Sequence, residues 1–360
     1  MQQGAAPPPT GASPAGAAAN TQAAPLTRSG NPAPTAQQSR PIAPAAAGAG
    51  IAPLSAQGQP LRRIDQLRGE RHETREGDRT IIREPDRTII REGGQIIVRH
   101  SEGDRFRYGA QEVHTERRGN DHVTVVVRPG GDRIVTTADE NGFLLRRSRL
   151  LPDGREIIII DNRPREAGFA AGRGFGGFFI NLPPPVIRIP RERYIVEMDR
   201  ANPALLYETL LAPPVEAIER SYTLDEIRFS APVRDRMPRI DLNTVTFESG
   251  SWELSPDQVG ALAGIAEGIN RAIQHNPREV FLIEGYTDAV GAEVDNLSLS
   301  DRRAESVAIA LTQQFAVPPE NLSTQGYGEQ YLKIPTDGPE RANRRVTVRR
   351  ITPLLAGRTP

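Results

Sequence analysis

Cysteine is absent from the 360 residues of this chain, and tryptophan occurs only once. Without cysteine the sequence can form no disulfide bond, no thiolate nucleophile and no metal site with sulfur ligands. It also offers no cysteine for lipid attachment. These chemistries are excluded, but the compartment is not decided, because many periplasmic proteins also lack cysteine.

Long apolar runs are absent as well. No stretch approaches the roughly 18–20 apolar residues that a membrane-spanning helix needs. The first residues, MQQGAAPPPTGASPAG, show neither the basic segment nor the apolar core of a secretory signal peptide. The chain is then either cytoplasmic or printed without its signal peptide, and the C-terminal region described below leads us to expect the second.

Neither sign of charge dominates, because 45 basic residues balance 45 acidic ones. We therefore expect no nucleic-acid partner. The 32 prolines, the 33 glycines and a hydrophobic content of 37% indicate a large unstructured fraction. Residues 1–60 carry charge only at Arg28 and Arg40 and are predicted to be a disordered tail rich in alanine, proline and glycine. This tail is either a functional spacer or featureless.

Residues 61–165 are predicted to combine a charged linker, or short exposed helix, with a β-rich repeat. DRTIIRE at 78–84 recurs at 86–92, and QIIVRH follows at 95–100, with turn signals between the units. Further β-rich runs bounded by turn signals lie at 123–127, 132–137, 143–148 and 156–160. We predict one small antiparallel meander, poorly cored because each repeat places a single isoleucine on each face.

Residues 166–237 are predicted to be a connector rich in glycine and proline, with short helices. The glycine-rich stretch 167–179 is followed by NLPPP. A phosphate-binding loop needs a helix that opens directly after it, and these prolines prevent one. We therefore expect no phosphate site here.

Residues 238–352 show local signals that agree with one another, and 353–360 form a short tail. Ser255, Pro256 and Gln258 predict a capping box before a helix with one apolar stripe. A second helix is predicted over 295–315. Strands are predicted at 241–247, 279–285, 321–326 and 345–351. The expected class is α+β, a mixed β-sheet with helices packed on one face.

Two opposite charges are predicted to meet in this domain. Asp288 lies in the loop after the second strand, and Arg303 emerges at the flank of the second helix. Asn296 lies two helical turns before Arg303, and Arg344 precedes the last strand. An arginine fork binds a carboxylate and an aspartate binds an ammonium, so these groups suit a zwitterionic ligand. The alternative is a structural Asp288–Arg303 salt bridge.

Four motifs then match a known family. GYTDAVG, DNLSLSDRRAESV, STQGYGEQY and GPERANRRV, spread over residues 241–351, resemble the OmpA-like C-terminal domain, which binds peptidoglycan non-covalently. The resemblance implies a mixed sheet with two main helices. It also implies that the ligand is the meso-diaminopimelate of the stem peptide, with Asp288 on the ammonium and Arg303 on the carboxylate.

The resemblance assigns a wider shell around these two charges. It implies that Asn296 and Arg344 belong to the ligand shell, together with Thr287 of the Thr-Asp pair, and that Leu254 is an apolar contact. Gly250 replaces an asparagine of some members, so only backbone groups remain there. Two further departures are Tyr286, where the family usually has histidine, and Val290, where some members have threonine.

We therefore expect a non-catalytic peptidoglycan-binding protein of the Gram-negative envelope, periplasmic and associated with the outer membrane, without cofactor or metal. An enzyme is disfavoured because only one of the five histidines, His275, lies in the C-terminal domain. Residues 78–162 are expected to contact an outer-membrane or envelope partner. In the alternative interpretation, the β-repeat is the interaction scaffold and the C-terminal domain only localises it to the wall.

Overall fold

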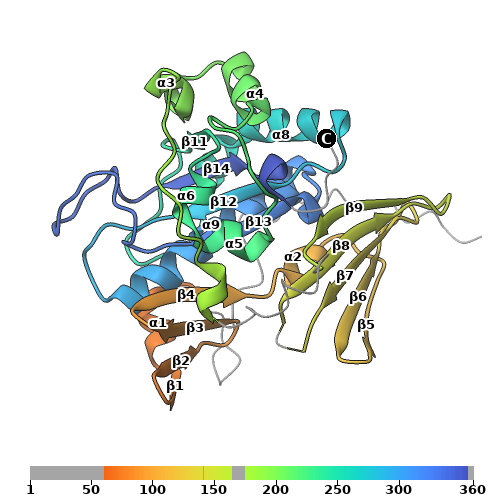
Figure 1. Cartoon of the computed structure of the whole chain (residues 1–360), viewed down its shortest axis with the longest axis horizontal. Coiled ribbons are helices and arrows are strands. Elements are labelled where there is room, and N and C mark those ends of the chain that lie inside the picture. Colours follow the sequence, from red (N-terminus) through yellow and green to blue (C-terminus); the bar gives the residue numbers. More distant parts are fainter. Residues whose placement is uncertain (1–60, 141, 164–174, 356–360) are drawn as a thin grey trace, which may run out of the picture. The chain divides into compact units, whose positions relative to one another are not determined.

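The computed structural model describes residues 61–140, 142–163 and 175–355. These residues belong to one compact unit and form three β-sheets with helices packed against them (Figure 1). The predicted disordered tail 1–60, most of the glycine-rich stretch 167–179 and the end of the tail 353–360 lie outside the described residues. Within the described part, no helix is long and apolar enough to cross a membrane.

The C-terminal sheet is mixed, as the sequence predicts. Its five strands lie in the order β10-β11-β14-β12-β13, and β12 pairs antiparallel with β14 and parallel with β13. The strands are β10 (Ile195–Glu197), β11 (Arg239–Asp241), β12 (Phe281–Gly285), β13 (Leu322–Gly326) and β14 (Val346–Arg350). The edge strand β10 comes from the region that we predicted to be a connector.

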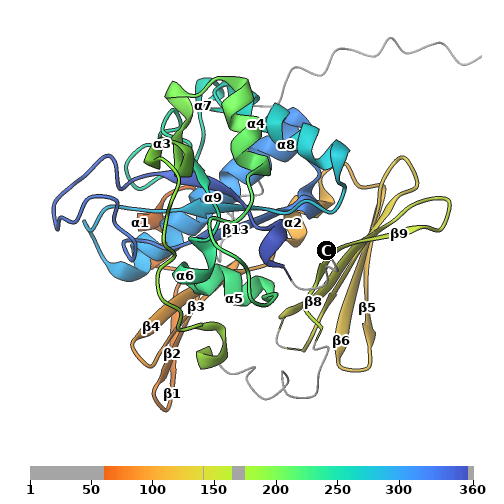
Figure 2. The same cartoon turned by 45° about the horizontal axis from the view of Figure 1, so that its top comes forward.

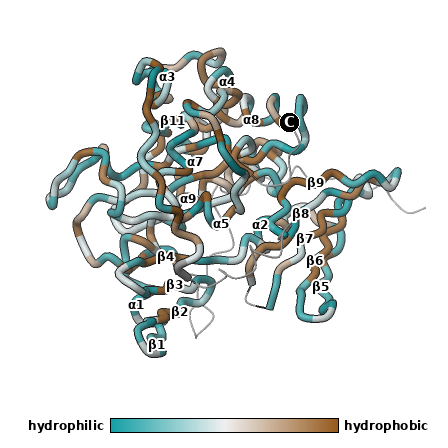
Figure 3. The backbone as a smooth tube through the Cα atoms, viewed as in Figure 1, coloured by the Kyte–Doolittle hydropathy of each residue, from teal (hydrophilic) through white to brown (hydrophobic). Residues whose placement is uncertain are grey.

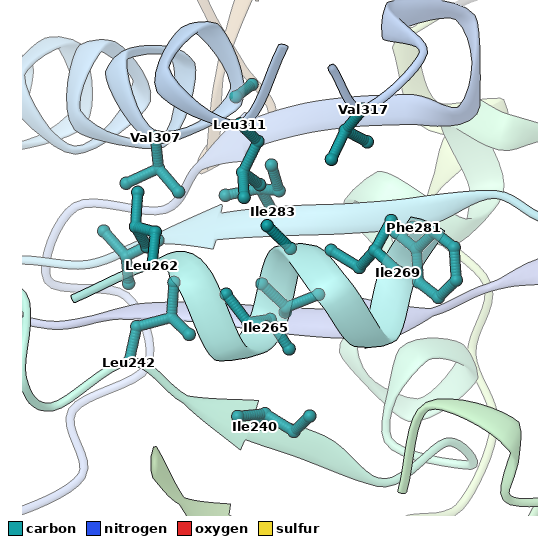
Figure 4. Close-up of a cluster of buried hydrophobic side chains, with 14 of the residues drawn as sticks. Ile240, Leu242, Leu262, Ile265, Ile269, Phe281, Ile283, Val307, Leu311 and Val317 are labelled. Atoms are coloured by element: carbon teal, nitrogen blue, oxygen red, sulfur yellow. The ribbon is translucent and has the colours of Figure 1, made fainter. Parts of the chain in front are cut away.

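Helices cover this sheet. The two main helices, α8 (Ala263–His275) and α9 (Glu293–Phe315), enclose one apolar core with one face of the sheet (Figure 4). On the other face, Leu282 of β12 packs with Ile227 and Val233 of two short helices. The remaining helices are α1 (Ile64–Arg68), α2 (Gly103–Arg107), α3 (Arg191–Tyr194), α4 (Pro203–Leu211), α5 (Leu224–Phe229), α6 (Ala231–Arg234) and α7 (Pro256–Gly260). Single 3-10 turns are η2 (Phe175–Phe178), η3 (Met198–Arg200), η4 (Pro319–Asn321) and η5 (Thr352–Leu354).

Two local predictions in this domain are wrong. The strand expected at 241–247 ends at Asp241, because Leu242 and Val245 both enter the core and a strand would send them to opposite faces. Ser255 precedes α7, but its side chain makes no capping bond. The predicted capping box fails because Oε1 of Gln258 instead accepts a hydrogen bond from the backbone N–H of Thr246 at 2.6 Å.

The predicted single meander is two separate antiparallel sheets, with α2 between them in the chain. The first contains β1 (His72–Glu76), β2 (Arg79–Arg83), β3 (Arg87–Glu92) and β4 (Gln95–His100). The second contains β5 (Glu112–Arg118), β6 (Asp121–Val127), β7 (Arg133–Ala138), β8 (Leu144–Leu150) and β9 (Glu156–Asp161). β1 and β5 were not predicted, because both strands are almost entirely polar, as the hydropathy colouring of Figure 3 shows.

We had expected a poorly cored sheet, but the first of these sheets has a core on both of its faces. One face, with Ile89 and Val98, packs against Leu297 of α9. The other face, with Ile97, packs against Phe178 and Phe229. One isoleucine on each face is therefore the correct pattern for a sheet that is covered on both sides.

Helix α9 lies in direct contact with the C-terminal sheet. A Cβ atom added to Gly285 of β12 would come within 1.9 Å of the backbone oxygen of Ser300, and one added to Gly326 of β13 within 2.3 Å of the backbone N of Asp301. Only glycine allows this approach. The same helix therefore touches the C-terminal sheet on one side and the β1–β4 sheet on the other.

Buried ion pairs join α9 to the β1–β4 sheet. The fully buried carboxylate of Asp301 accepts hydrogen bonds from Arg87 Nε at 2.8 Å and from the backbone N–H of Gly326 at 2.8 Å, and His100 Nδ1 lies 2.8 Å from it. Next to it, the guanidinium of Arg302 pairs with Glu84 at 2.9 Å and with Asp86 at 2.6 Å. One helix therefore carries both the charges that hold the N-terminal sheet and the predicted ligand-site residues Asn296 and Arg303.

This network predicts a pH-dependent stability. Burial lowers the pKa of His100, but the carboxylates of Asp301 and Glu305 outweigh burial and nearby Arg87 and raise it to about 9. The unfolded chain loses this proton near pH 6.5 while the folded protein keeps it. The contribution of His100 to the free energy of unfolding should therefore be fully present below about pH 6.5. The free energy of unfolding should then fall by up to about 3 kcal/mol as the pH rises to about 9.

Urea unfolding between pH 6 and 9 measures this loss. His100→Gln should flatten the pH dependence, whereas the matched change His275→Gln, at the exposed end of α8, should leave it unchanged. An equally steep dependence in His100→Gln would show that another group is responsible.

Candidate ligand-binding site

Asp288 lies in the loop that follows β12 and is almost fully buried, with 7% of its surface exposed. Its Oδ2 accepts a hydrogen bond from Arg344 Nη1 at 2.5 Å and another from the backbone N–H of Glu340 at 3.3 Å. Arg344 stands just before β14 and keeps 43% of its side chain exposed. The Asp288 carboxylate is thus paired with an exposed guanidinium and not, as the salt-bridge alternative requires, with Arg303.

Arg303 is buried on α9, with 4% of its surface exposed. Its Nε donates to the backbone oxygen of Ser251 at 3.0 Å and its Nη2 to the backbone oxygen of Glu248 at 3.1 Å. Its guanidinium also lies 5.0 Å from the ring centre of Phe247. Among the described residues, no carboxylate lies within ion-pair distance of this cation.

The pKa of Arg303 shows which charges lie near it. Burial is the main cause that lowers this pKa. The positive charge of Arg344 lowers it as well, the negative charge of Asp288 opposes both, and together they bring the pKa to about 10. The structure therefore brings Asp288, Arg303 and Arg344 into one electrostatic neighbourhood. Two cations and one anion meet there, and a second carboxylate, that of Glu329, lies beside them and accepts a hydrogen bond from Asn296.

Asn296 and Thr287 hold the loop that carries Asp288. The side-chain Nδ2 of Asn296 donates to Glu329 Oε2 at 2.6 Å and to the backbone oxygens of Asp288 and Val290, both at 3.3 Å. The backbone N–H of Thr287 donates to the oxygen of Gly328 at 2.9 Å. The buried hydroxyl of Thr287 has no hydrogen-bond partner in the described part of the chain.

The two remaining residues of the predicted shell lie on the segment before α7. Leu254 is buried in the main core beside α8, so little of its side chain can reach a ligand. Gly250 has a φ of +68°, and its backbone oxygen accepts a hydrogen bond from Ile64 of α1 at 2.9 Å. Helix α1, from the predicted charged linker, thus packs on the same segment whose carbonyl oxygens hold Arg303.

Several groups that shape the site were not predicted. They are the carbonyl oxygens of Glu248 and Ser251, the carboxylate of Glu329 and the N–H of Glu340. Backbone oxygens leave no signal in the identity of a residue, and Glu329 and Glu340 come from a loop that reaches the site only in the folded chain. Of the two departures from the family pattern, Tyr286 is buried against Arg345, whereas Val290 is half exposed.

A cavity of about 630 Å³ lies elsewhere, beside β10 and α4, and includes Arg191, Leu205 and Lys333 but none of the predicted site residues. Its size alone does not identify a site. The buried charges of Asp288 and Arg303 favour the loop after β12 instead, since unbalanced buried charge is costly without a ligand. Within the described part, no group of three or more His, Asp or Glu residues is placed to hold a metal ion.

A comparison with protein families matches the part of the chain that contains this loop. Residues 246–345 match the model of the OmpA family. The chain is 38% identical over 86 residues to the probable lipoprotein YiaD of Escherichia coli, covering 24% of this chain and 37% of that protein. It is 36% identical over 108 residues to the outer-membrane lipoprotein YfiB of Pseudomonas aeruginosa, covering 29% and 60%. The chain thus spans less than two thirds of the length of either relative.

Two of the solved structures that match the chain each cover about 30% of it. The OmpA-like domain of FopA1 from Francisella tularensis is 20% identical and covers 31% of this chain and 70% of that one, with a TM-score of 0.26. The peptidoglycan-associated lipoprotein from Burkholderia pseudomallei is 22% identical and covers 29% and 86%, with a TM-score of 0.25. With the family match and the mixed sheet described above, residues 246–345 of this chain form an OmpA family domain.

Proposed function

We propose that the C-terminal domain binds peptidoglycan non-covalently, by holding the zwitterionic end of meso-diaminopimelate in the stem peptide. The observation that carries this proposal is the buried cation of Arg303, whose hydrogen bonds within the described part of the chain go to backbone oxygens and not to a carboxylate. A ligand carboxylate there would supply the missing anion through charge-assisted hydrogen bonds. The match of residues 246–345 to the OmpA family supports the same assignment.

The ammonium of the ligand would go to Asp288. In the structure this carboxylate pairs with Arg344, whose side chain is 43% exposed and can turn towards solvent at little cost. A ligand ammonium can then take its place at Asp288, and Arg344 becomes available to a second ligand carboxylate.

We further propose that the protein is not an enzyme and resides in the periplasm of a Gram-negative envelope, near the outer membrane. The name of the outer-membrane lipoprotein YfiB supports the location. The β1–β4 sheet is covered on both faces, so a partner of the envelope would use the β5–β9 sheet. Because the β1–β4 sheet is covered, the proposed partner region narrows from residues 78–162 to residues 112–161.

Calorimetry with stem peptides tests the chemistry of the site. A peptide with meso-diaminopimelate should bind at least about tenfold more tightly than the same peptide with lysine, because lysine keeps the ammonium but lacks the carboxylate that faces Arg303. A diaminopimelate peptide with that carboxylate amidated is the matched control and should behave like the lysine peptide. Equal affinity for all three peptides would contradict the proposed role of Arg303.

A further inference from the structure

The free edge of β5 is an unpaired surface that the proposed binding of peptidoglycan does not use. β5 is the outermost strand of the β5–β9 sheet, with β6 on one side (Figures 1 and 2). Six of its seven residues are exposed, and Val113 is half-buried. No strand of the described part pairs with its other edge. A long, regular edge of this kind is a template for another strand.

The hairpin geometry shows which backbone groups face this edge. β5 and β6 are joined by the two-residue turn Gly119–Asn120, so the flanking residues Arg118 and Asp121 form a hydrogen-bonded pair. Hydrogen-bonded residues alternate along an antiparallel ladder. The backbone groups at even-numbered positions therefore bond to β6, and those of Val113, Thr115 and Arg117 point to the free edge.

We propose that a second copy of this chain pairs with β5 across this edge, antiparallel, with the two Thr115 residues on a two-fold axis. This register makes Thr115 opposite Thr115, and Val113 opposite Arg117, the hydrogen-bonded pairs. Each of these three pairs exchanges two bonds, which gives about six in all. The two sheets would join into one continuous sheet through an isologous contact.

The side chains of β5 are complementary to themselves in this register. Glu112 faces Arg118 of the second copy, and His114 faces Glu116 of the second copy, so each acid meets a base. These residues lie in non-hydrogen-bonded pairs, where cross-strand side chains approach most closely. In the single chain the same groups only form exposed pairs within the strand, Glu112 with His114 and Glu116 with Arg118, which contribute little.

The charges of β5 could instead protect its free edge from pairing with another strand. The features of this strand favour pairing with a second copy over such protection. Protected edges often carry charged side chains, lysine above all, or a proline or a bulge. β5 has neither lysine nor proline nor a break in its register with β6, and it carries acidic and basic side chains together. The other exposed edge strand, β1, is shorter, and only Glu73 and Arg75 would present backbone groups to a partner. Its contact would be smaller, so β5 is the interface.

The dimer is expected to be weak, because its contact is small and polar. It goes beyond the proposed function, since it gives one particle two OmpA family domains. Two linked sites on a polymeric ligand raise the overall affinity without any new contact.

Sedimentation equilibrium of the full chain, from about 5 to 500 µM, tests the pairing. We expect the wild type to pass from monomer to dimer in this range, as for small polar interfaces. Thr115→Pro should raise the dimer dissociation constant at least about tenfold, because the lost N–H faces the second copy and not β6. Arg75→Pro, the matched change on β1, should leave the constant unchanged. A wild type that stays monomeric, or a dimer that responds to Arg75→Pro and not to Thr115→Pro, overturns the proposal.

A charge exchange tests the register even if the proline variant does not fold. Glu112→Arg and Arg118→Glu each place like charges opposite each other and should raise the dissociation constant about tenfold. Mixing the two variants restores both pairs and should restore dimerisation to the wild-type level. Circular dichroism checks that each variant keeps its strands. A mixture that dimerises no better than either variant alone overturns the Thr115-centred register.

Discussion

Replacing Arg303 by alanine is expected to release the protein from isolated peptidoglycan sacculi, with an affinity loss of roughly 30-fold or more. The change removes the buried cation that we assign to the ligand carboxylate and leaves that carboxylate without a partner, a loss of about 2–5 kcal/mol. Co-sedimentation with sacculi at about 0.15 M salt measures the effect. Arg303→Lys should bind weakly, since lysine keeps the charge but not the fork geometry.

The fold should survive this change. Burial lowers the pKa of Arg303, so its charge is held at a cost in the ligand-free protein. Its hydrogen-bond acceptors, the backbone oxygens of Glu248 and Ser251, belong to a segment that α1 also supports. The free energy of unfolding of Arg303→Ala should therefore stay within about 1 kcal/mol of the wild type.

Arg271→Ala, on the exposed side of α8, is the matched control and should sediment like the wild type. Full retention of Arg303→Ala on sacculi would show that the site is wrong. Binding of the wild type that disappears at high salt would instead indicate nonspecific charge attraction.

Replacing Asp301 by alanine is expected to destabilise the protein by about 3–5 kcal/mol, the cost of breaking a buried ion pair from one side. The Asp301 carboxylate is fully buried between Arg87, His100 and the backbone N–H of Gly326. Although burial opposes it, the charges of His100 and Arg87 keep the pKa of Asp301 well below its usual range. Its removal leaves two buried cations without this partner.

Urea unfolding measures this loss, and Asp104→Ala is the matched control because the Asp104–Arg107 pair is exposed on both sides. The control should change the free energy of unfolding by less than about 0.5 kcal/mol. Limited proteolysis should also cut the β1–β4 sheet of Asp301→Ala faster, as the sheet loses its anchor on α9. A destabilisation of Asp301→Ala below about 1 kcal/mol would contradict the role of this network.

Local patterns predicted the C-terminal domain well, and the reason is physical. The apolar stripe of α8 and the continuous apolar run of β12 are short-range patterns, and a buried face requires them in any context. The same rule failed at 241–247, where the apolar residues predicted a strand. Leu242 and Val245 would lie on opposite faces of a strand, but both enter one core. Local pattern cannot distinguish a strand from a turn that buries both residues.

The N-terminal sheets were harder to predict because their cover comes from far away in the sequence. Ile89 alone suggests a thin sheet, but it packs against Leu297, about two hundred residues later. The strands β1 and β5 carry no alternation of apolar and polar residues. Each is held in place by hydrogen bonds to one neighbouring strand. In such strands the hydrogen-bond ladder and not the side-chain pattern defines the structure.

The sequence by itself determined the repeat of β-rich units, the OmpA-like motifs and the residue types that could recognise a zwitterion, because these depend on identity and short-range spacing. Only the tertiary structure decided that Asp288 pairs with Arg344 and that Arg303 contacts backbone oxygens instead of a carboxylate. It also decided that α9 is held by a second sheet. Which side chains form an ion pair depends on which of them meet after long loops close. Spacing along the chain does not give the distance between them in space.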